Sequence, residues 1–387
     1  MNQLRIIYYA DSFCGLSETY VYRTAQCLSA VAPMTVLTHE RQYPDAFPDD
    51  ALDIRIVPRP SSRLAKANAV LRGWWLCGVR DGCSLSPRRL WRIAGQPQRG
   101  VIFAQFGLAG VRALRAAASL QWPMIVNFHN CDLTSWLVFR GYVRNLVRLF
   151  SFPNLVFLVP SRYIAAKLVA LGAPEVRTRV YYNPIPIPNL SRPEGDKKAS
   201  VVFLHAGRLV PMKGITYTIK AFAKIATAYD CCLRIIGGGP EEQTARRLAS
   251  ELGIADRVTF LGAVEFSVVQ REMDGADILV QHSVTADDGE TEGLPVAICE
   301  AMSYQLPVIS TRHAGIPEVV THGLTGLLTT ERDVEEMARA MQSLVENRAM
   351  RLELGNRGRL AIVKNFSMQA AQSFLEQLVL KQLPTLS

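Results

Sequence analysis

The chain has 387 residues, of which 49% are hydrophobic and 20% are charged, so extended disorder is excluded as its main state. This length suits two domains of ordinary size better than one core. The net charge of +9 indicates a polyanion, an anionic membrane or a phosphorylated substrate as partner. Residues 1–200 hold 25 Lys/Arg against 12 Asp/Glu, and the remainder holds 18 against 22, so the positive excess lies in the first half.

Short apolar runs alternate with amphipathic segments through the first half, which is typical of strand–helix units around a parallel sheet. Strands are predicted at 4–9, 34–38, 54–57, 101–105, 124–128, 155–159 and 179–182. Helices are predicted at 18–30, 109–120, 133–150 and 161–171, the last capped by Ser161. These elements define an N-terminal domain over residues 1–183.

A proline-rich segment, residues 184–199, predicts an extended linker, because alternating prolines cannot continue a helix or a central strand. After the linker the strand–helix alternation resumes, and it defines a second domain over 200–365. Strands are predicted at 200–205, 231–236, 257–261, 277–281, 306–310 and 325–328. Helices are predicted at 214–228, 240–252, 267–273, 295–303, 333–346 and 348–364. A final segment, 366–387, is expected to pack back on the first domain.

The pattern therefore predicts an α/β protein with two doubly wound, Rossmann-like domains and a cleft between the carboxyl edges of their sheets, where ligands of such sheets bind. The eight cysteines show no CxxC spacing and no zinc-type cluster, which favours buried free thiols in a reduced compartment. No apolar run approaches the roughly 18 residues that span a bilayer. We therefore expect a cytoplasmic protein, soluble or peripherally bound at the inner face of the plasma membrane.

Two cations follow the first predicted strand of the second domain. Arg208 and Lys213 lie in the turn before a helix, where a planar fork and a point charge can hold a diphosphate. Basic residues in such a loop are more often simply solvated, so this motif alone is a weak signal.

The segment TEGLPVAICEAM, residues 291–302, strengthens the diphosphate interpretation. Its glutamates, Glu292 and Glu300, suit the paired hydroxyls of a hexose and a ribose, because an ionised carboxylate only accepts hydrogen bonds. The backbone amides of Gly293 and Leu294, at the start of the predicted helix, suit an anionic phosphate. Together these features predict a sugar-nucleotide site.

Several motifs resemble the second domain of family 4 retaining glycosyltransferases, whose GT-B fold consists of two facing Rossmann-like domains. They are GRLxxxKG (207–214), EGLPVxxxEAM (292–302), LPVIST (306–311), AGIPE (314–318) and GLTGLL (323–328). In the first half, FCGLSETYVYRTAQCLS (13–29), FHNCDL (128–133) and VPSRYIAAKLVALG (159–172) resemble the exopolysaccharide branch, which includes colanic acid-type transferases. The resemblance covers most of the chain, and it is weakest over residues 40–100.

The resemblance implies a role for each matching residue. Arg208 and Lys213 would hold the donor diphosphate, while Glu292 would contact the donor sugar and Glu300 the ribose. Gly15 would let the backbone approach the phosphate, His129 would border the anomeric centre, and Asp132 would lie on the acceptor side. The chain departs from the family pattern at Leu16, where a second glycine is common, and at Asn130, where glycine is usual.

The expected reaction is transfer of a hexose from a UDP- or GDP-sugar to a polyprenyl-diphosphate-linked glycan in bacterial exopolysaccharide, capsule or lipopolysaccharide synthesis. The chain contains no Asp-x-Asp, so we expect no metal and no other cofactor, with fixed cations neutralising the leaving group. A sugar-nucleotide-binding hydrolase or epimerase of the same fold is the alternative. Arg208 and Lys213 favour the transferase over a hydrolase, because a hydrolase of neutral sugars does not need them.

The basic first half also predicts contact with an anionic membrane. Residues 59–115 contain eleven Lys/Arg and one acid, Asp81, with tryptophans interleaved. The residues expected at the membrane surface are Arg72, Trp74, Trp75, Arg88, Arg89, Trp91 and Arg92. In the helix predicted at 133–150, Arg140, Arg144 and Arg148 recur on one face, and membrane contact and simple solvation are equally open there. A nucleic-acid-binding protein is a distant alternative, since the sequence shows no helix-turn-helix, RNP-like or zinc-finger motif.

Overall fold

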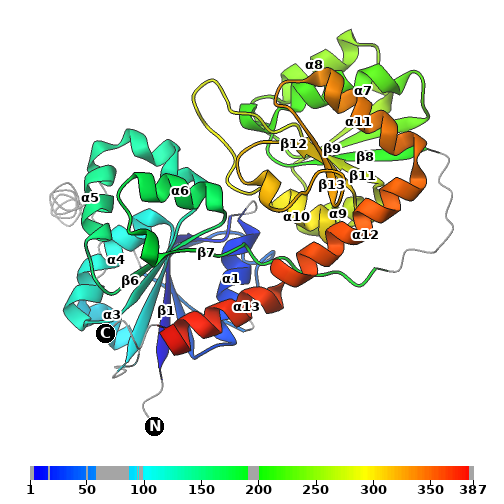
Figure 1. Ribbon diagram of the computed structural model, residues 1–387. Coiled ribbons are helices and arrows are strands. Elements are labelled where there is room, and N and C mark those ends of the chain that lie inside the picture. The colour runs from blue at the N-terminus through cyan, green and yellow to red at the C-terminus, as the bar shows by residue number, and fades with distance from the viewer. Residues whose placement is uncertain are drawn as a thin grey trace. The chain divides into compact units, whose positions relative to one another are not determined.

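The computed structural model describes residues 4–15, 18–48, 51–57, 87–93, 95, 99–190 and 200–382. Contacts divide the chain into two compact units. One unit comprises the residues up to Pro184 together with those from Met368 onward, and the other is Ile185–Ser367. We call them the N-terminal and the C-terminal domain. In each of them helices flank a central sheet (Figure 1).

The N-terminal sheet has seven strands in the order β3-β2-β1-β4-β5-β6-β7, and every adjacent pair is parallel. The strands are β1 (Arg5–Phe13), β2 (Met34–Arg41), β3 (Asp53–Ile56), β4 (Gly100–Gln105), β5 (Met124–Asn127), β6 (Leu155–Val159) and β7 (Thr178–Val180). Because the strands are parallel, the carboxyl ends of β1, β4 and β5 meet at one edge. The loops that leave these ends carry Gly15, Phe106 and His129.

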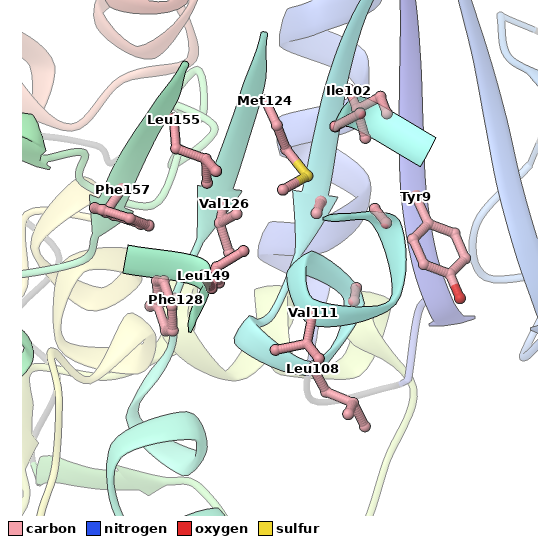
Figure 2. Packing of buried hydrophobic residues seen from close by; sticks show 14 of the residues in the cluster. Tyr9, Ile102, Leu108, Val111, Met124, Val126, Phe128, Leu149, Leu155 and Phe157 are labelled. Atoms are coloured by element: carbon pink, nitrogen blue, oxygen red, sulfur yellow. The ribbon is translucent and has the colours of Figure 1, made fainter. Parts of the chain in front are cut away.

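Helices cover both faces of this sheet. They are α1 (Thr19–Ser29), α3 (Pro87–Ile93), α4 (Gly107–Leu120), α5 (Arg140–Phe150), α6 (Arg162–Ala170) and α13 (Met368–Glu376), which continues as a π-helical turn to Gln382. Helices α3, α4, α5 and α6 bury their apolar side chains in one cluster, shown in part in Figure 2, with Tyr9, Ile102 and Phe157 from the sheet. Helices α1 and α13 pack on the opposite face.

The C-terminal sheet has six strands in the order β10-β9-β8-β11-β12-β13, again all parallel. The strands are β8 (Val201–Ala206), β9 (Cys231–Ile236), β10 (Val258–Gly262), β11 (Ile278–Val280), β12 (Val308–Thr311) and β13 (Gly326–Thr329). The helices are α7 (Ile215–Ala226), α8 (Glu242–Glu251), α9 (Phe266–Gly275), α10 (Val296–Ser303), α11 (Val334–Glu346) and α12 (Arg348–Asn365). Helices α7, α8 and α11 share one core cluster with the sheet.

The expected strands are confirmed in both domains, because each apolar run forms a parallel strand, buried in the middle of the sheet and partly exposed at the edge strands β3 and β7. The helix expected at 133–150 is wrong in its first half. Residues 130–138 instead form two 3₁₀ turns, η1 (Asn130–Leu133) and η2 (Ser135–Val138), and α5 begins only at Arg140. Asp132 explains the break, since its carboxylate accepts from the backbone N–H of His129 in a local capping box and from that of Gly107, a tertiary bond, and together they override helix propensity. Across the described ranges, no helix combines the length and the hydropathy needed to cross a bilayer.

Candidate functional site

The C-terminal domain gathers its polar site residues at the carboxyl ends of three adjacent strands, β8, β11 and β12. Arg208 and Lys213 follow β8, Gln281 and Ser283 follow β11, and His313 follows β12. Parallel pairing explains the convergence, because it aligns the carboxyl ends of neighbouring strands at one edge of the sheet. The residues therefore meet although they are far apart in sequence.

Lys213 and Glu292 form a buried ion pair at this edge. The Nζ of Lys213 lies 2.6 Å from Oε1 of Glu292, and the side chains are only 11% and 7% exposed. The same carboxylate oxygen accepts hydrogen bonds from Gln281 Nε2 at 3.2 Å and Ser283 Oγ at 3.4 Å. Each charge is therefore compensated despite its burial, which keeps a cation and a carboxylate fixed in a site with little water.

A histidine and a second glutamate hold the loop that carries Glu292. The backbone N–H of Glu292 donates to Nε2 of His313 at 3.0 Å, so the ring proton lies on Nδ1, which donates to Glu331 at 2.6 Å. The backbone N–H of Thr285 donates to the other oxygen of Glu331 at 2.8 Å. Burial raises the pKa of Glu331, but these hydrogen bonds and the nearby charges outweigh it and leave the pKa below its usual value.

Two glycines allow the loops of the site to approach each other closely. Gly214 precedes α7 with a φ of +58°, and a Cβ there would lie 1.9 Å from the carbonyl oxygen of His282. Gly237 has a φ of +122°, and a Cβ there would lie 1.9 Å from the carbonyl oxygen of Gly207. A larger residue at either position would push apart the loops that carry Lys213 and Arg208.

The other residues expected to bind the donor occupy different environments. Arg208 is exposed. Gly293 and Leu294 are buried just before α10, which begins at Val296. Glu300 lies within α10 and lines a pocket of about 70 Å³ with Pro186, Phe266 and Tyr304 among its walls.

In the N-terminal domain His129 follows β5 and is 5% exposed. Its ring packs against Tyr20 and Phe106, with ring centroids 4.5 and 4.9 Å apart, and its Nε2 lies 2.7 Å from Nε2 of Gln105. Burial lowers the pKa of His129 to about 3, so the ring is neutral at physiological pH.

Asp132 lies in η1, which follows His129, and is 1% exposed. Its oxygens accept hydrogen bonds from the backbone N–H groups of His129 at 2.9 Å and Gly107 at 3.0 Å, and from the hydroxyl of Tyr142 at 3.2 Å. Burial raises the pKa of Asp132 to about 7 against the opposing effect of these donors. The geometry makes this carboxylate a support for the His129 loop, and the structure gives it no exposed surface toward an acceptor.

Gly15 lies beyond the end of β1, where its N–H is 3.4 Å from a carboxylate oxygen of Glu18. Of the residues expected at a membrane, Arg88, Trp91 and Arg92 are exposed on α3, with Trp91 at 42%. Arg89 belongs to the same helix. Arg72, Trp74 and Trp75 lie outside the described residues.

Several members of the cluster around Lys213 and Glu292 were not identified from the sequence. Gln281, Ser283, His313 and Glu331 belong to no motif that was recognised, yet the first three are almost fully buried polar residues. Their common signal is position, because Gln281 and His313 follow the carboxyl ends of β11 and β12. Among the described residues, no group of three or more His, Cys, Asp or Glu is arranged to hold a metal ion.

Comparison with known families assigns both domains. Residues 17–187 match the Glycosyltransferase Family 4 model, and residues 187–361 match the Glycosyl transferases group 1 model. The chain therefore belongs to the family 4-type glycosyltransferases, as the resemblance of its motifs predicted. Its fold is accordingly GT-B, with two Rossmann-like parallel-sheet domains.

Two curated relatives are named for polysaccharide synthesis. The amylovoran biosynthesis glycosyltransferase AmsK of Erwinia amylovora is 31% identical over 254 residues, which cover 64% of this chain and 62% of AmsK, less than two-thirds of that relative. WcaL of Escherichia coli, whose name assigns it to colanic acid biosynthesis as a glycosyltransferase, is 29% identical over 350 residues, covering 84% of this chain and 83% of WcaL.

Solved structures support the fold assignment. Alr3699/HepE from Anabaena in complex with UDP superposes with a TM-score of 0.77 and 18% identity over 97% of this chain and 98% of HepE. The complex of the same protein with UDP-glucose gives a TM-score of 0.76 at 19% identity, over 96% and 98% of the two chains. At these identities the likeness establishes the fold alone.

Proposed function

We propose that this glycosyltransferase moves a hexose from a UDP- or GDP-sugar to a lipid-linked oligosaccharide, with retention of anomeric configuration. The buried pair of Lys213 and Glu292, with the exposed Arg208 in the same loop after β8, is the observation that carries the proposal. A departing nucleoside diphosphate develops about two negative charges, and preorganised cations stabilise them without reorganisation of solvent. The likeness to the UDP-glucose complex of HepE supports a nucleotide-sugar donor.

In this scheme the ion pair is the resting form of the donor site. When the diphosphate arrives, the ammonium of Lys213 turns toward it, and Arg208 adds a planar fork. The carboxylate of Glu292 then accepts hydrogen bonds from the hydroxyls of the donor sugar, still oriented by Gln281 and Ser283. Glu300 binds the ribose, and the backbone amides of Gly293 and Leu294 meet phosphate oxygens.

The N-terminal domain supplies the acceptor side. The neutral ring of His129 borders the reacting sugar, and Asp132 fixes its loop. Gly15 lets the backbone approach the phosphates. The proposal includes catalysis without a metal and synthesis of an exopolysaccharide, capsule or lipopolysaccharide at the cytoplasmic membrane face, in keeping with the names of AmsK and WcaL.

A screen of UDP- and GDP-sugars tests the donor assignment without any acceptor. Thermal stabilisation and slow donor hydrolysis are measured for each nucleotide sugar, with and without a metal chelator. We expect one base to be preferred, hydrolysis to persist in the chelator, and Lys213→Ala to lower the hydrolysis rate. The donor assignment fails if no nucleotide sugar stabilises or is hydrolysed by the protein, and the metal-independent scheme fails if the chelator abolishes turnover.

A further inference from the structure

The helices that the structure describes on one face of the N-terminal sheet contain no acidic residue. Helices α3, α4, α5 and α6 share a core cluster, yet none of their sequences includes Asp or Glu. Figure 1 shows these helices on one side of the sheet. We call this the acid-free helical face. Its exposed arginines include Arg88, Arg92, Arg115, Arg140, Arg144 and Arg148.

Helix α5 and the two residues before it, Val138 at the end of η2 and Phe139, add exposed apolar side chains to these charges. Val138 is 74% exposed, Phe139 53% and Val147 52%. Leu146 and Leu149 of the same helix are buried in the core, so the exposed apolar residues are additional to those that hold α5 on the sheet.

The spacing along α5 aligns these residues in two adjacent rows. Arg140, Arg144 and Arg148 recur every fourth residue, and Phe139 and Val147 flank them one position earlier at the same period. All three arginines are exposed. One surface of α5 therefore combines cationic heads with an apolar row.

Neighbouring elements extend and fix this surface. Helix α4 packs against both α3 and α5, which places Arg115 in the same layer as Trp91. At the carboxyl end of α5, the guanidinium of Arg177 donates to the carbonyl oxygens of Phe150 and Phe152. This brings the 76%-exposed Val176 to that end, beside the exposed Glu175, an acid that lies outside the four helices.

We propose that the acid-free helical face, centred on α5, docks on the surface of an anionic phospholipid bilayer. The inference rests on the proposed function, because a lipid-linked acceptor is presented at such a surface. Arginines meet lipid phosphates, while Val138, Phe139 and Val147 enter the boundary between headgroups and acyl chains. Single-stranded nucleic acid also offers phosphates, but it buries aliphatic valines poorly, and this favours the bilayer.

Each arginine near an anionic leaflet raises the partition coefficient of the protein onto the membrane by about fivefold. The three arginines on α5 should therefore raise it by roughly hundredfold. The test compares Arg140→Gln/Arg144→Gln/Arg148→Gln with the matched triple variant Arg247→Gln/Arg271→Gln/Arg348→Gln, whose arginines are exposed on the C-terminal domain. Sedimentation is measured with vesicles of phosphatidylcholine containing phosphatidylglycerol, and with phosphatidylcholine alone. We expect roughly hundredfold weaker binding to the anionic vesicles for the α5 variant only.

Three outcomes would overturn the docking face. They are unchanged vesicle binding by the α5 variant, equal binding of the unmodified protein to both vesicle types, and tighter binding to a single-stranded oligonucleotide than to anionic vesicles. The variant Phe139→Ser/Val147→Ser keeps the charge of the acid-free helical face. We expect it to bind anionic vesicles more weakly than the unmodified protein at high salt, where the electrostatic attraction is screened. Equal vesicle binding by the two proteins at high salt would overturn apolar insertion. Donor hydrolysis without vesicles separates the two proposals, since its absence contradicts the proposed function and leaves the vesicle result standing.

Discussion

In the C-terminal domain, charged side chains repeatedly meet an opposite charge, as Lys213 meets Glu292, Lys224 meets Glu335 and Arg234 meets Glu272. In the N-terminal domain, helices α3 to α6 expose arginines without any acid in the same helices. The two domains have related parallel-sheet folds, so the fold does not dictate this difference. The difference agrees with the two proposals. In the C-terminal domain, ion pairs neutralise cations until the small anionic donor binds, whereas the N-terminal domain presents acid-free, positively charged helices to an extended anionic surface.

The two domains also differ in how they keep a buried acid. Glu292 is paired with a cation, whereas Asp132 is held by three uncharged donors. A carboxylate with a nearby cation is ready to exchange that partner for a phosphate or a hydroxyl. A carboxylate bound to backbone N–H groups fixes the conformation of its loop through those hydrogen bonds. The comparison thus separates a binding role from a supporting role.

The largest effect is expected from Lys213→Ala. Removal of one preorganised donor typically lowers the rate by about 10²–10³-fold, and here it also leaves Glu292 buried without its cation. Donor hydrolysis and transfer are measured alongside Lys224→Ala, which breaks an ion pair of the same 2.6 Å length that is exposed. Similar rates for the two variants would contradict the distinction between a functional and a surface pair.

The shifted pKa values of Asp132 and His129 predict opposite effects of pH on the stability of the N-terminal domain. Burial raises the pKa of Asp132 to about 7, so its stabilising contribution is complete below the unfolded value of 3.8 and is lost as pH rises through 7. Burial lowers the pKa of His129 to about 3, so its contribution is present above 6.5 and is lost as pH falls toward 3. Between these unfolded values the two contributions largely cancel.

The cancellation is tested by replacing one of the two titrating side chains at a time. As pH falls from about 6.5 to 4.5, the unfolding free energy of Asp132→Asn should fall relative to the unmodified protein by about 1.4 kcal/mol per pH unit. For His129→Asn it should rise by a similar amount. All five tryptophans lie in the first 200 residues, so their fluorescence during urea unfolding reports this domain. Parallel pH profiles for the three proteins would contradict both shifted pKa values.

Sequence patterns predicted the strands well, because a parallel strand buried on both faces needs a continuous apolar run, as in LVFLV of β6. They predicted Lys213 and Glu292 as site residues through motifs. They did not predict that these residues pair directly, which depends on the alignment of β8, β11 and β12. The helix predicted from residue 133 was wrong over its first half, because the bond between Asp132 and Gly107 is tertiary and leaves no periodic signal. His313 was missed since a single histidine carries no pattern.

His313→Ala is expected to have a smaller effect than Lys213→Ala, since His313 acts through the backbone of Glu292. The variant leaves the N–H of Glu292 and the carboxylate of Glu331 without their shared partner. We expect about a tenfold fall in kcat with little change in KM for the donor, from a loss of about 1–2 kcal/mol of positioning. His313→Gln, which retains an acceptor, should recover part of the rate. A loss confined to thermal stability, with no recovery by glutamine, would contradict the positioning role.

The smallest effect is expected from Lys224→Ala as a stability change. Its Nζ lies 2.6 Å from Oε1 of Glu335, as close as Lys213 lies to Glu292, but the two side chains are 44% and 63% exposed. Water and salt screen such a pair, so its removal should lower the unfolding free energy by less than about 1 kcal/mol, and by still less at high ionic strength. Calorimetry at two salt concentrations measures this change. A loss as large as that of Lys213→Ala would show that distance, rather than burial, sets the strength of these pairs, and the contrast drawn between them would no longer hold.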